Sequence, residues 1–187
     1  MTTVYFIRHA ESDHADKNER ARGLSAKGKA DVALVNRFFD DKIIDAAFSS
    51  PYQRAVDTIR DVAKKNRLTI QNTEGFREWK RTPDPSETFN EFCRRHWEDP
   101  DYRYSNGESL NDVKRRNAAA LNDVLSICED KTVIIGTHGM ALSTIISIFD
   151  PLFGCDNFFE LLPHMPLIVK MIFDNHQCLS IEQFTFD

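Results

Sequence analysis

The chain has 187 residues, and 24 lysines and arginines against 29 aspartates and glutamates give a formal net charge of −5. This mildly acidic balance argues against a nucleic-acid or membrane-surface partner, because both reward a strong basic excess. A chain of this length can bury enough apolar surface to fold without a disulfide or a metal staple. We therefore expect a single domain over residues 1–187.

Cysteine usage and the N-terminus favour a cytoplasmic protein. The cysteines are far apart and form no Cys-x-x-Cys pair, which gives no support for a disulfide framework or a structural zinc site. The N-terminus lacks the basic head and long apolar run of a signal peptide. No stretch has the roughly 18 apolar residues that cross a membrane.

Strands and helices alternate in the first part of the chain. Residues 3–7 are mostly β-branched or aromatic and predict a strand. Ser25 is a favourable N-cap for a helix, whose inward face is expected to carry Ala30, Ala33, Leu34 and Phe38. Residues 46–48 predict a second strand. We expect the next helix to have Ser50 as its cap and Pro51 in its first position.

The alternation continues to the C-terminus. The second helix should bury Ala55, Ile59, Val62 and Ala63, and residues 68–73 predict a third strand. Residues 108–128 predict a longer helix that buries Leu110, Val113, Leu121, Val124 and Leu125. The continuous apolar run at 132–135 is typical of a strand covered on both faces. A buried helix from Gly139 and two closing strands, 166–173 and 178–186, complete the pattern.

This alternation indicates an α/β fold, a three-layer α/β/α sandwich with a mostly parallel central sheet. Residues 79–106 interrupt it with three prolines, six aromatic residues and no clean period. We expect this segment to be a small inserted lid. Its aromatic residues beside Arg94 and Arg95 would also suit RNA stacking, but nearby acidic residues dilute any basic patch.

Charged side chains follow four of the predicted strands. The first strand ends at Arg8 and His9, and Arg54 lies one turn into the helix after the second strand. Glu78 follows the third strand, and His138 follows the long apolar one. Because ligands bind beyond the carboxyl ends of parallel strands, we expect these side chains to form one site.

Such a set suits phosphoryl transfer. Arginine forks match phosphate oxygens two at a time, and a neutral imidazole such as His9 is a nucleophile near neutral pH. A protonated His138 would stabilise transition-state charge, and Glu78 would protonate the leaving alkoxide and then activate water. The N–H groups of the helix from Gly139 would face the same anion. No metal or cofactor is required, because side chains supply the cations. Each residue alone has an ordinary structural explanation, so position indicates a site and leaves the reaction open.

Short segments in order along the chain resemble the histidine phosphatase superfamily, the phosphoglycerate-mutase-like proteins. They are Arg8-His9-Ala10-Glu11-Ser12, Leu24-Ser25-Ala26-Lys27-Gly28, Ser49-Ser50-Pro51-Tyr52-Gln53-Arg54-Ala55, Gly107-Glu108-Ser109 and Thr137-His138-Gly139. The resemblance implies that His9 is the phosphorylated nucleophile and that Arg8, Arg54 and His138 form the phosphate pocket. Glu78 matches the acid by position, although its neighbours differ from the family's, and Glu11 is the alternative acid.

Departures from the family pattern favour a phosphatase over a mutase. Ala10 replaces a glycine, and His14 and Ala15 stand where the mutase version has Trp and Asn, an Asn that many phosphatases of the family share. An alanine side chain cannot donate the hydrogen bond with which that Asn contacts phosphate. The lid is also shorter than we expect of a mutase, which must retain a bisphosphorylated intermediate.

We therefore expect a metal-independent phosphomonoesterase that hydrolyses a small phosphorylated metabolite through a phosphohistidine. The alternatives are a phosphoglycerate-mutase-type phosphotransferase, a non-catalytic phospholigand-binding module and, ranked low, a metallohydrolase using His9 and His138. A phosphoprotein substrate also stays open. The lid cations either contact further anionic groups of the substrate or pair with lid acids; they are Lys80, Arg81, Arg94, Arg95 and Arg103.

Overall fold

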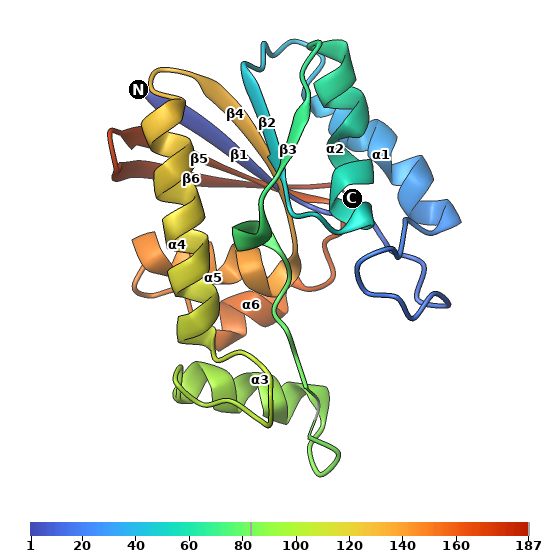
Figure 1. Cartoon of the computed structure of the whole chain (residues 1–187), viewed down its shortest axis with the longest axis vertical. Helices are drawn as coiled ribbons and strands as arrows, with labels where there is room; N and C mark the ends of the chain where they lie inside the picture. Colours follow the sequence, from blue (N-terminus) through green and yellow to red (C-terminus); the bar gives the residue numbers. More distant parts are fainter. Residues whose placement is uncertain (83, 187) are drawn as a thin grey trace.

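A six-stranded sheet with the order β3-β2-β4-β1-β5-β6 forms the centre of the computed structural model, which describes residues 1–82 and 84–186 (Figure 1). The strands are β1 (Thr2–Arg8), β2 (Ala46–Ser49), β3 (Ile70–Asn72), β4 (Thr132–Thr137), β5 (Leu167–Asp174) and β6 (Gln177–Thr185). Strands β1 to β4 pair in parallel, and β5 and β6 add an antiparallel edge. The predicted α/β class and mostly parallel sheet are confirmed.

Helices cover both faces of this sheet. They are α1 (Ala26–Phe38), α2 (Gln53–Lys65), α3 (Phe89–Glu98), α4 (Leu110–Ile127), α5 (Gly139–Phe149) and α6 (Cys155–Leu161), with a short 3-10 turn η1 (Glu74–Phe76). In Figure 1, α1 and α2 lie on one side of the sheet, and α4 and α5 lie on the other. No helix in the described part of the chain is long and apolar enough to cross a membrane.

Two apolar cores separate the layers, and the central strands contribute to both. In β1, Val4 and Phe6 pack toward α4 and α5, whereas Tyr5 and Ile7 pack toward α1 and α2. Because successive side chains of a strand point to opposite faces, an unbroken apolar run is what a strand between two helical layers requires. The same reasoning explains β4, which is buried along nearly its whole length.

The predicted inward face of α1 is right only in part, since Phe38 packs against the core and Leu34 is half-buried. Ala30 and Ala33 are exposed, and the buried side of the helix carries Gly28, Val32 and Val35. Gly28 packs directly on the backbone of the loop after β1: a Cβ there would lie 2.0 Å from the carbonyl oxygen of Glu11. A residue without a side chain therefore makes the closest contact of this helix and sets its rotation.

The predicted start of α2 is wrong. The helix begins at Gln53 with Tyr52 as its N-cap residue, because Ser50 still pairs with β4 and the chain bends at Pro51 and Tyr52 before the helix. The backbone N–H of Ser50 donates to the carbonyl of Gly136 (2.8 Å), which prolongs the β2–β4 pairing by one residue. The predicted apolar stripe of this helix is buried.

The segment 79–106 contains a helix that the sequence reading did not predict. Helix α3 begins with a capping box in which Thr88 and Glu91 satisfy each other's backbone N–H groups. Phe92 and Cys93 on this helix join the core that also holds α4 and α5. Figure 1 shows α3 beyond the end of α4, away from the sheet.

Candidate active site

Three neighbouring strands, β2, β4 and β1, end side by side. Their register pairs Arg8 with Thr137 and Ser49 with Gly136, so the next residue of each strand starts a loop at the same level. The backbone N–H of His9 still donates to the carbonyl of Thr137 (3.1 Å). Parallel pairing thus brings residues from three distant segments to one edge.

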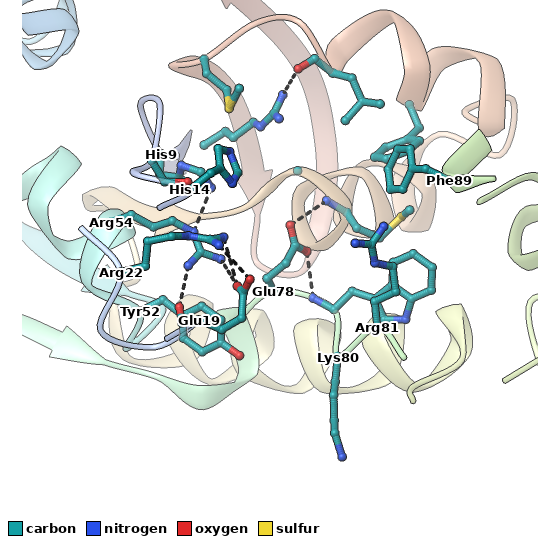
Figure 2. Close-up of a pocket in the computed structure, with 18 residues that line it drawn as sticks. His9, His14, Glu19, Arg22, Tyr52, Arg54, Glu78, Lys80, Arg81 and Phe89 are labelled. Atoms are coloured by element: carbon teal, nitrogen blue, oxygen red, sulfur yellow. Dashed lines mark hydrogen bonds and ion pairs between the residues drawn. The ribbon is translucent and has the colours of Figure 1, made fainter. Parts of the chain in front are cut away.

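A pocket of about 580 Å³ opens at this edge, and its lining includes Arg8, His9, Arg54 and Glu78 (Figure 2). The structure brings four of the five predicted residues to its wall. His138 lies behind the wall, fully buried, with its ring 5.2 Å from the ring of His9. The five predicted residues therefore form one cluster, in which His138 lies behind His9 and does not line the pocket.

The hydrogen bonds of His9 assign its protonation. Its Nδ1 lies 2.6 Å from the carbonyl oxygen of Ala10, an acceptor, so Nδ1 carries the proton. Nε2 accepts from Nε of Arg54 (3.2 Å) and therefore presents a lone pair. Burial and then the neighbouring Arg54 lower the pKa of His9 well below its usual value. His9 is thus a neutral imidazole whose unprotonated Nε2 is hydrogen-bonded to Arg54.

Arg8 is anchored from the opposite side of the pocket. Its Nη1 donates to the carbonyls of Leu161, Leu162 and His164 at 2.8, 2.9 and 3.0 Å, where helix α6 ends. Carbonyls at a helix C-terminus carry partial negative charge, so they stabilise a buried guanidinium. Burial lowers the pKa of Arg8 to about 10, against the opposite effect of Glu78, so Arg8 stays a cation at neutral pH.

Arg54 is held by the loop of residues 13–23, which follows the Arg8–Ser12 segment. Its Nη1 donates to the backbone carbonyl of Glu19 (2.6 Å), and its Nη2 donates to the Glu19 carboxylate (3.2 Å). Arg22 pairs with the same carboxylate at 3.0 Å and also lines the pocket. The sequence reading missed both residues, because residues 13–23 lack the periodicity that places a side chain. The only sequence feature that could have indicated them is their charge, a few residues after the Arg8–Ser12 segment.

Glu78 caps helix α5. Its carboxylate accepts from the backbone N–H groups of Trp79 (2.8 Å), Ala141 (3.1 Å) and Met140 (3.3 Å). The expectation that the first N–H groups of this helix face a bound anion is therefore wrong for these two. A glutamate side chain already takes them, because a helix N-terminus favours any nearby negative charge.

His138 departs from the expected protonated state. Burial, then His9 and Arg54, lower its pKa well below its usual value, so the ring is neutral at physiological pH in this arrangement. Its Nε2 lies 2.7 Å from the hydroxyl of Ser50, and its Nδ1 is buried without a hydrogen-bond partner among the described residues. An anion bound beside His9 would favour the cationic form of His138.

A half-buried ion network holds the backbone that carries Glu78. Arg116 donates to the carbonyls of Arg77 (2.8 Å) and Glu78 (3.2 Å), and both arginines donate to the carboxylate of Glu108. Burial acts to raise the pKa of Glu108, but hydrogen bonds from Arg77 and Arg116 lower it to about 2. The network thus fixes the position of Glu78 from behind.

The lid cations divide into two groups. Arg94, Arg95 and Arg103 pair with Asp156, Glu87 and Asp112. Lys80 and Arg81 are part of the pocket lining instead, but the Lys80 side chain points away from Glu78 (Figure 2). Between residues 1 and 186, apart from residue 83, no three His, Cys, Asp or Glu side chains are grouped so that they could hold a metal ion.

Comparison with known proteins agrees with the strand-end motifs. A family model described as the histidine phosphatase superfamily (branch 1) matches residues 4–159. The chain belongs to this superfamily. The match includes all five residues predicted for the site and the parallel strands β1 to β4, and it stops within α6, before β5 and β6.

Individual relatives of this superfamily member include both phosphatases and mutases. Phosphoserine phosphatase 1 of Hydrogenobacter thermophilus is 27% identical, over 88% of this chain and 87% of its own length. A probable phosphoglycerate mutase of Proteus mirabilis is 28% identical, over 79% and 74%. The structure of Bacillus stearothermophilus YhfR shares the fold, with a TM-score of 0.78, 23% identity and coverage of 96% and 95%. The family and the phosphatase relative support a phosphatase activity for this chain.

The network behind Glu78 predicts acid-sensitive stability. The pKa of Glu108 is about 2 in the fold against a usual 4.5, so its ionised form stabilises the fold above that usual value. This contribution is lost as the pH falls from 4.5 toward 2. We expect Glu108→Gln to lower the free energy of unfolding by roughly 2 to 3 kcal/mol near neutral pH, and by less in acid.

Urea denaturation at about pH 7 and about pH 3 measures both differences. Glu182→Gln is the matched control, because that carboxylate pairs with Lys170 at the surface and should contribute less than about 1 kcal/mol. A loss in Glu108→Gln that equals the control, or that does not shrink in acid, would contradict the role of the network.

Proposed function

We propose that this protein is a metal-independent phosphomonoesterase that hydrolyses a small phosphorylated metabolite through a phosphohistidine at His9. One observation carries the proposal: Nε2 of a buried, neutral His9 is unprotonated and is held beside Arg54, at a pocket that Arg8 also lines. A neutral nucleophile among cations attracts a phosphate ester without losing its own lone pair to a proton. Relatives named as phosphatases add support.

The first step forms a bond from Nε2 of His9 to phosphorus and breaks the phosphorus–oxygen ester bond. The electron pair of that bond leaves on the alkoxide, which takes a proton from Glu78, so the form of the enzyme that reacts has this carboxyl protonated. Arg8 and Arg54 balance the negative charge on the phosphoryl oxygens. Once that charge is present, it stabilises the protonated form of His138. The leaving group departs as a neutral alcohol.

The second step returns the enzyme to its starting state. A water molecule attacks phosphorus, gives a proton to the Glu78 carboxylate, and breaks the phosphorus–nitrogen bond. Inorganic phosphate leaves, and the electron pair of the broken bond returns to Nε2 of His9. One carboxylate thus acts as acid and then as base, in the same position.

Hydrolysis is favoured over transfer by residues of this chain. His14 lines the pocket, and Ala15 beside it lacks the side-chain amide that the mutase version of the family places there. A phosphohistidine with fewer contacts to its leaving molecule exchanges that molecule for water. We further propose that residues 79–106 act as a small lid within one domain, since Lys80, Arg81 and Phe89 reach the pocket from this segment.

The lining supports a substrate that carries a second polar or anionic group. Arg81 stands on the lid side of the pocket, where it can contact a part of the substrate beyond its phosphate, whereas the Lys80 side chain points away from the other pocket side chains (Figure 2). The phosphoserine phosphatase relative is named for a substrate of this type. We propose phosphorylated small acids as the first class to screen.

The role of His9 is tested with para-nitrophenyl phosphate in the presence of EDTA. Turnover by the wild type should fall by at least about a thousandfold in His9→Ala, because no other nucleophile replaces it. His176→Ala is the control, since this exposed histidine lies outside the pocket and should leave turnover unchanged. Turnover that survives in His9→Ala, or that EDTA abolishes in the wild type, would contradict the proposal.

The role of Glu78 is tested by varying the leaving group. An alkoxide needs a proton as it leaves and nitrophenolate does not, so Glu78→Gln should lower kcat/KM for an alkyl phosphate far more than for para-nitrophenyl phosphate. We expect a difference of about a hundredfold. Because kcat/KM reports the first irreversible step, the base role in the second step does not affect the comparison. Equal losses for both esters would assign the acid to another group, with Glu11→Gln as the next variant.

A further inference from the structure

The carboxylate of Glu19 occupies the donor edge of Arg54 that faces the nucleophile. In a guanidinium, Nε and Nη2 lie on one edge, the edge that grips two oxygens of an anion. In Arg54 this edge points Nε at Nε2 of His9 (3.2 Å) and Nη2 at Oε2 of Glu19 (3.2 Å). One Glu19 oxygen therefore stands next to the place where a phosphoryl group on His9 would lie.

Arg22 completes this arrangement. It contacts both oxygens of the same carboxylate, with Nη1 at 3.0 Å and Nη2 at 3.2 Å, so Glu19 bridges two guanidinium groups (Figure 2). The Arg22 side chain is 11% exposed, and its Nε is buried without a hydrogen-bond partner among the described residues. Two neighbouring guanidiniums repel each other: Arg22 acts to lower the pKa of Arg54 after burial, and Glu19 acts to raise it. An anion between them is a requirement of the site.

The Glu19 carboxylate is only weakly held between Arg54 and Arg22. The Glu19 side chain is 59% exposed, so it can swing into water at little cost. A phosphate group carries more charge than a carboxylate and offers three oxygens to the same donors. Phosphate is therefore the stronger anion for the two arginines.

We propose that Glu19 is a built-in substitute for the phosphoryl group, displaced when substrate binds, and that Arg22 then becomes a further ligand of that group. This inference rests on the proposed function, because it places the phosphoryl group on His9. It predicts two opposite effects from two residues that contact each other: loss of the Glu19 charge strengthens anion binding, and loss of Arg22 weakens it.

The test is calorimetric titration of the full chain with inorganic phosphate, which needs no turnover. We expect Glu19→Gln to bind phosphate about threefold more tightly, since a neutral amide competes less for Arg54. We expect Arg22→Ala to bind it about tenfold more weakly and Arg22→Lys to lie between. Glu182→Gln is the control: it removes another exposed carboxylate paired with a cation, Lys170, outside the pocket lining, and should leave phosphate binding unchanged.

The outcomes separate this inference from the proposed function. Wild-type binding with no tightening in Glu19→Gln would overturn the occupant role, and unchanged binding in Arg22→Ala and Arg22→Lys would overturn the ligand role. Thermal unfolding of each variant shows whether a loss of binding reflects a loss of fold. A wild type that binds no phosphate would overturn the phosphoryl site itself, together with the proposed function.

Discussion

The contact between Nε of Arg54 and Nε2 of His9 is the interaction on which the rest of the site depends (3.2 Å). It keeps the proton on the other ring nitrogen, and it sets a cation against the lone pair that would attack phosphorus. A buried guanidinium is costly unless its remaining donors find acceptors. The neighbouring structure supplies them: the Glu19 loop for Arg54, and the carbonyls at the end of α6 for Arg8.

The fold provides these acceptors because its parallel strands end together. With β2, β4 and β1 adjacent, each loop that leaves the sheet can contribute a side chain to one pocket. The antiparallel strands β5 and β6 follow α6 in the chain and leave the carbonyls at its end free to hold Arg8. Behind the pocket, Glu108 and its arginines fix the chain at Glu78, so the site has rigid support on both sides.

Much of the fold could be predicted from the sequence, because apolar periodicity reports burial directly. The strands and the buried stripe of α2 are of this kind. Where close packing depends on a glycine, apolar periodicity predicts part of the helix face wrongly. Gly28 sets the rotation of α1, yet it has no apolar side chain that would indicate its burial. Helix α3 did have a signal, since Thr88 and Glu91 form the capping box that starts it.

The candidate site was predictable only in part, for a similar reason. Residues directly after strand ends, such as His9 and His138, follow from topology once the sheet is known to be parallel. Glu19 and Arg22 lie in an irregular loop, where no rule links sequence position to spatial position. The neutral state of His138 depends on complete burial beside other positive groups, which only the folded structure contains.

The central claim is that the phosphoryl group passes through His9, and detection of that bond tests it most directly. Wild-type enzyme mixed with excess substrate is quenched in alkali within one turnover, digested, and examined by mass spectrometry. The account predicts one phosphoryl group on His9, in the peptide from the N-terminus, and its loss on acid treatment, as expected of a phosphorus–nitrogen bond. Efficient turnover with no phosphoryl group on His9 at any time point, or with the group on another residue, would contradict the account.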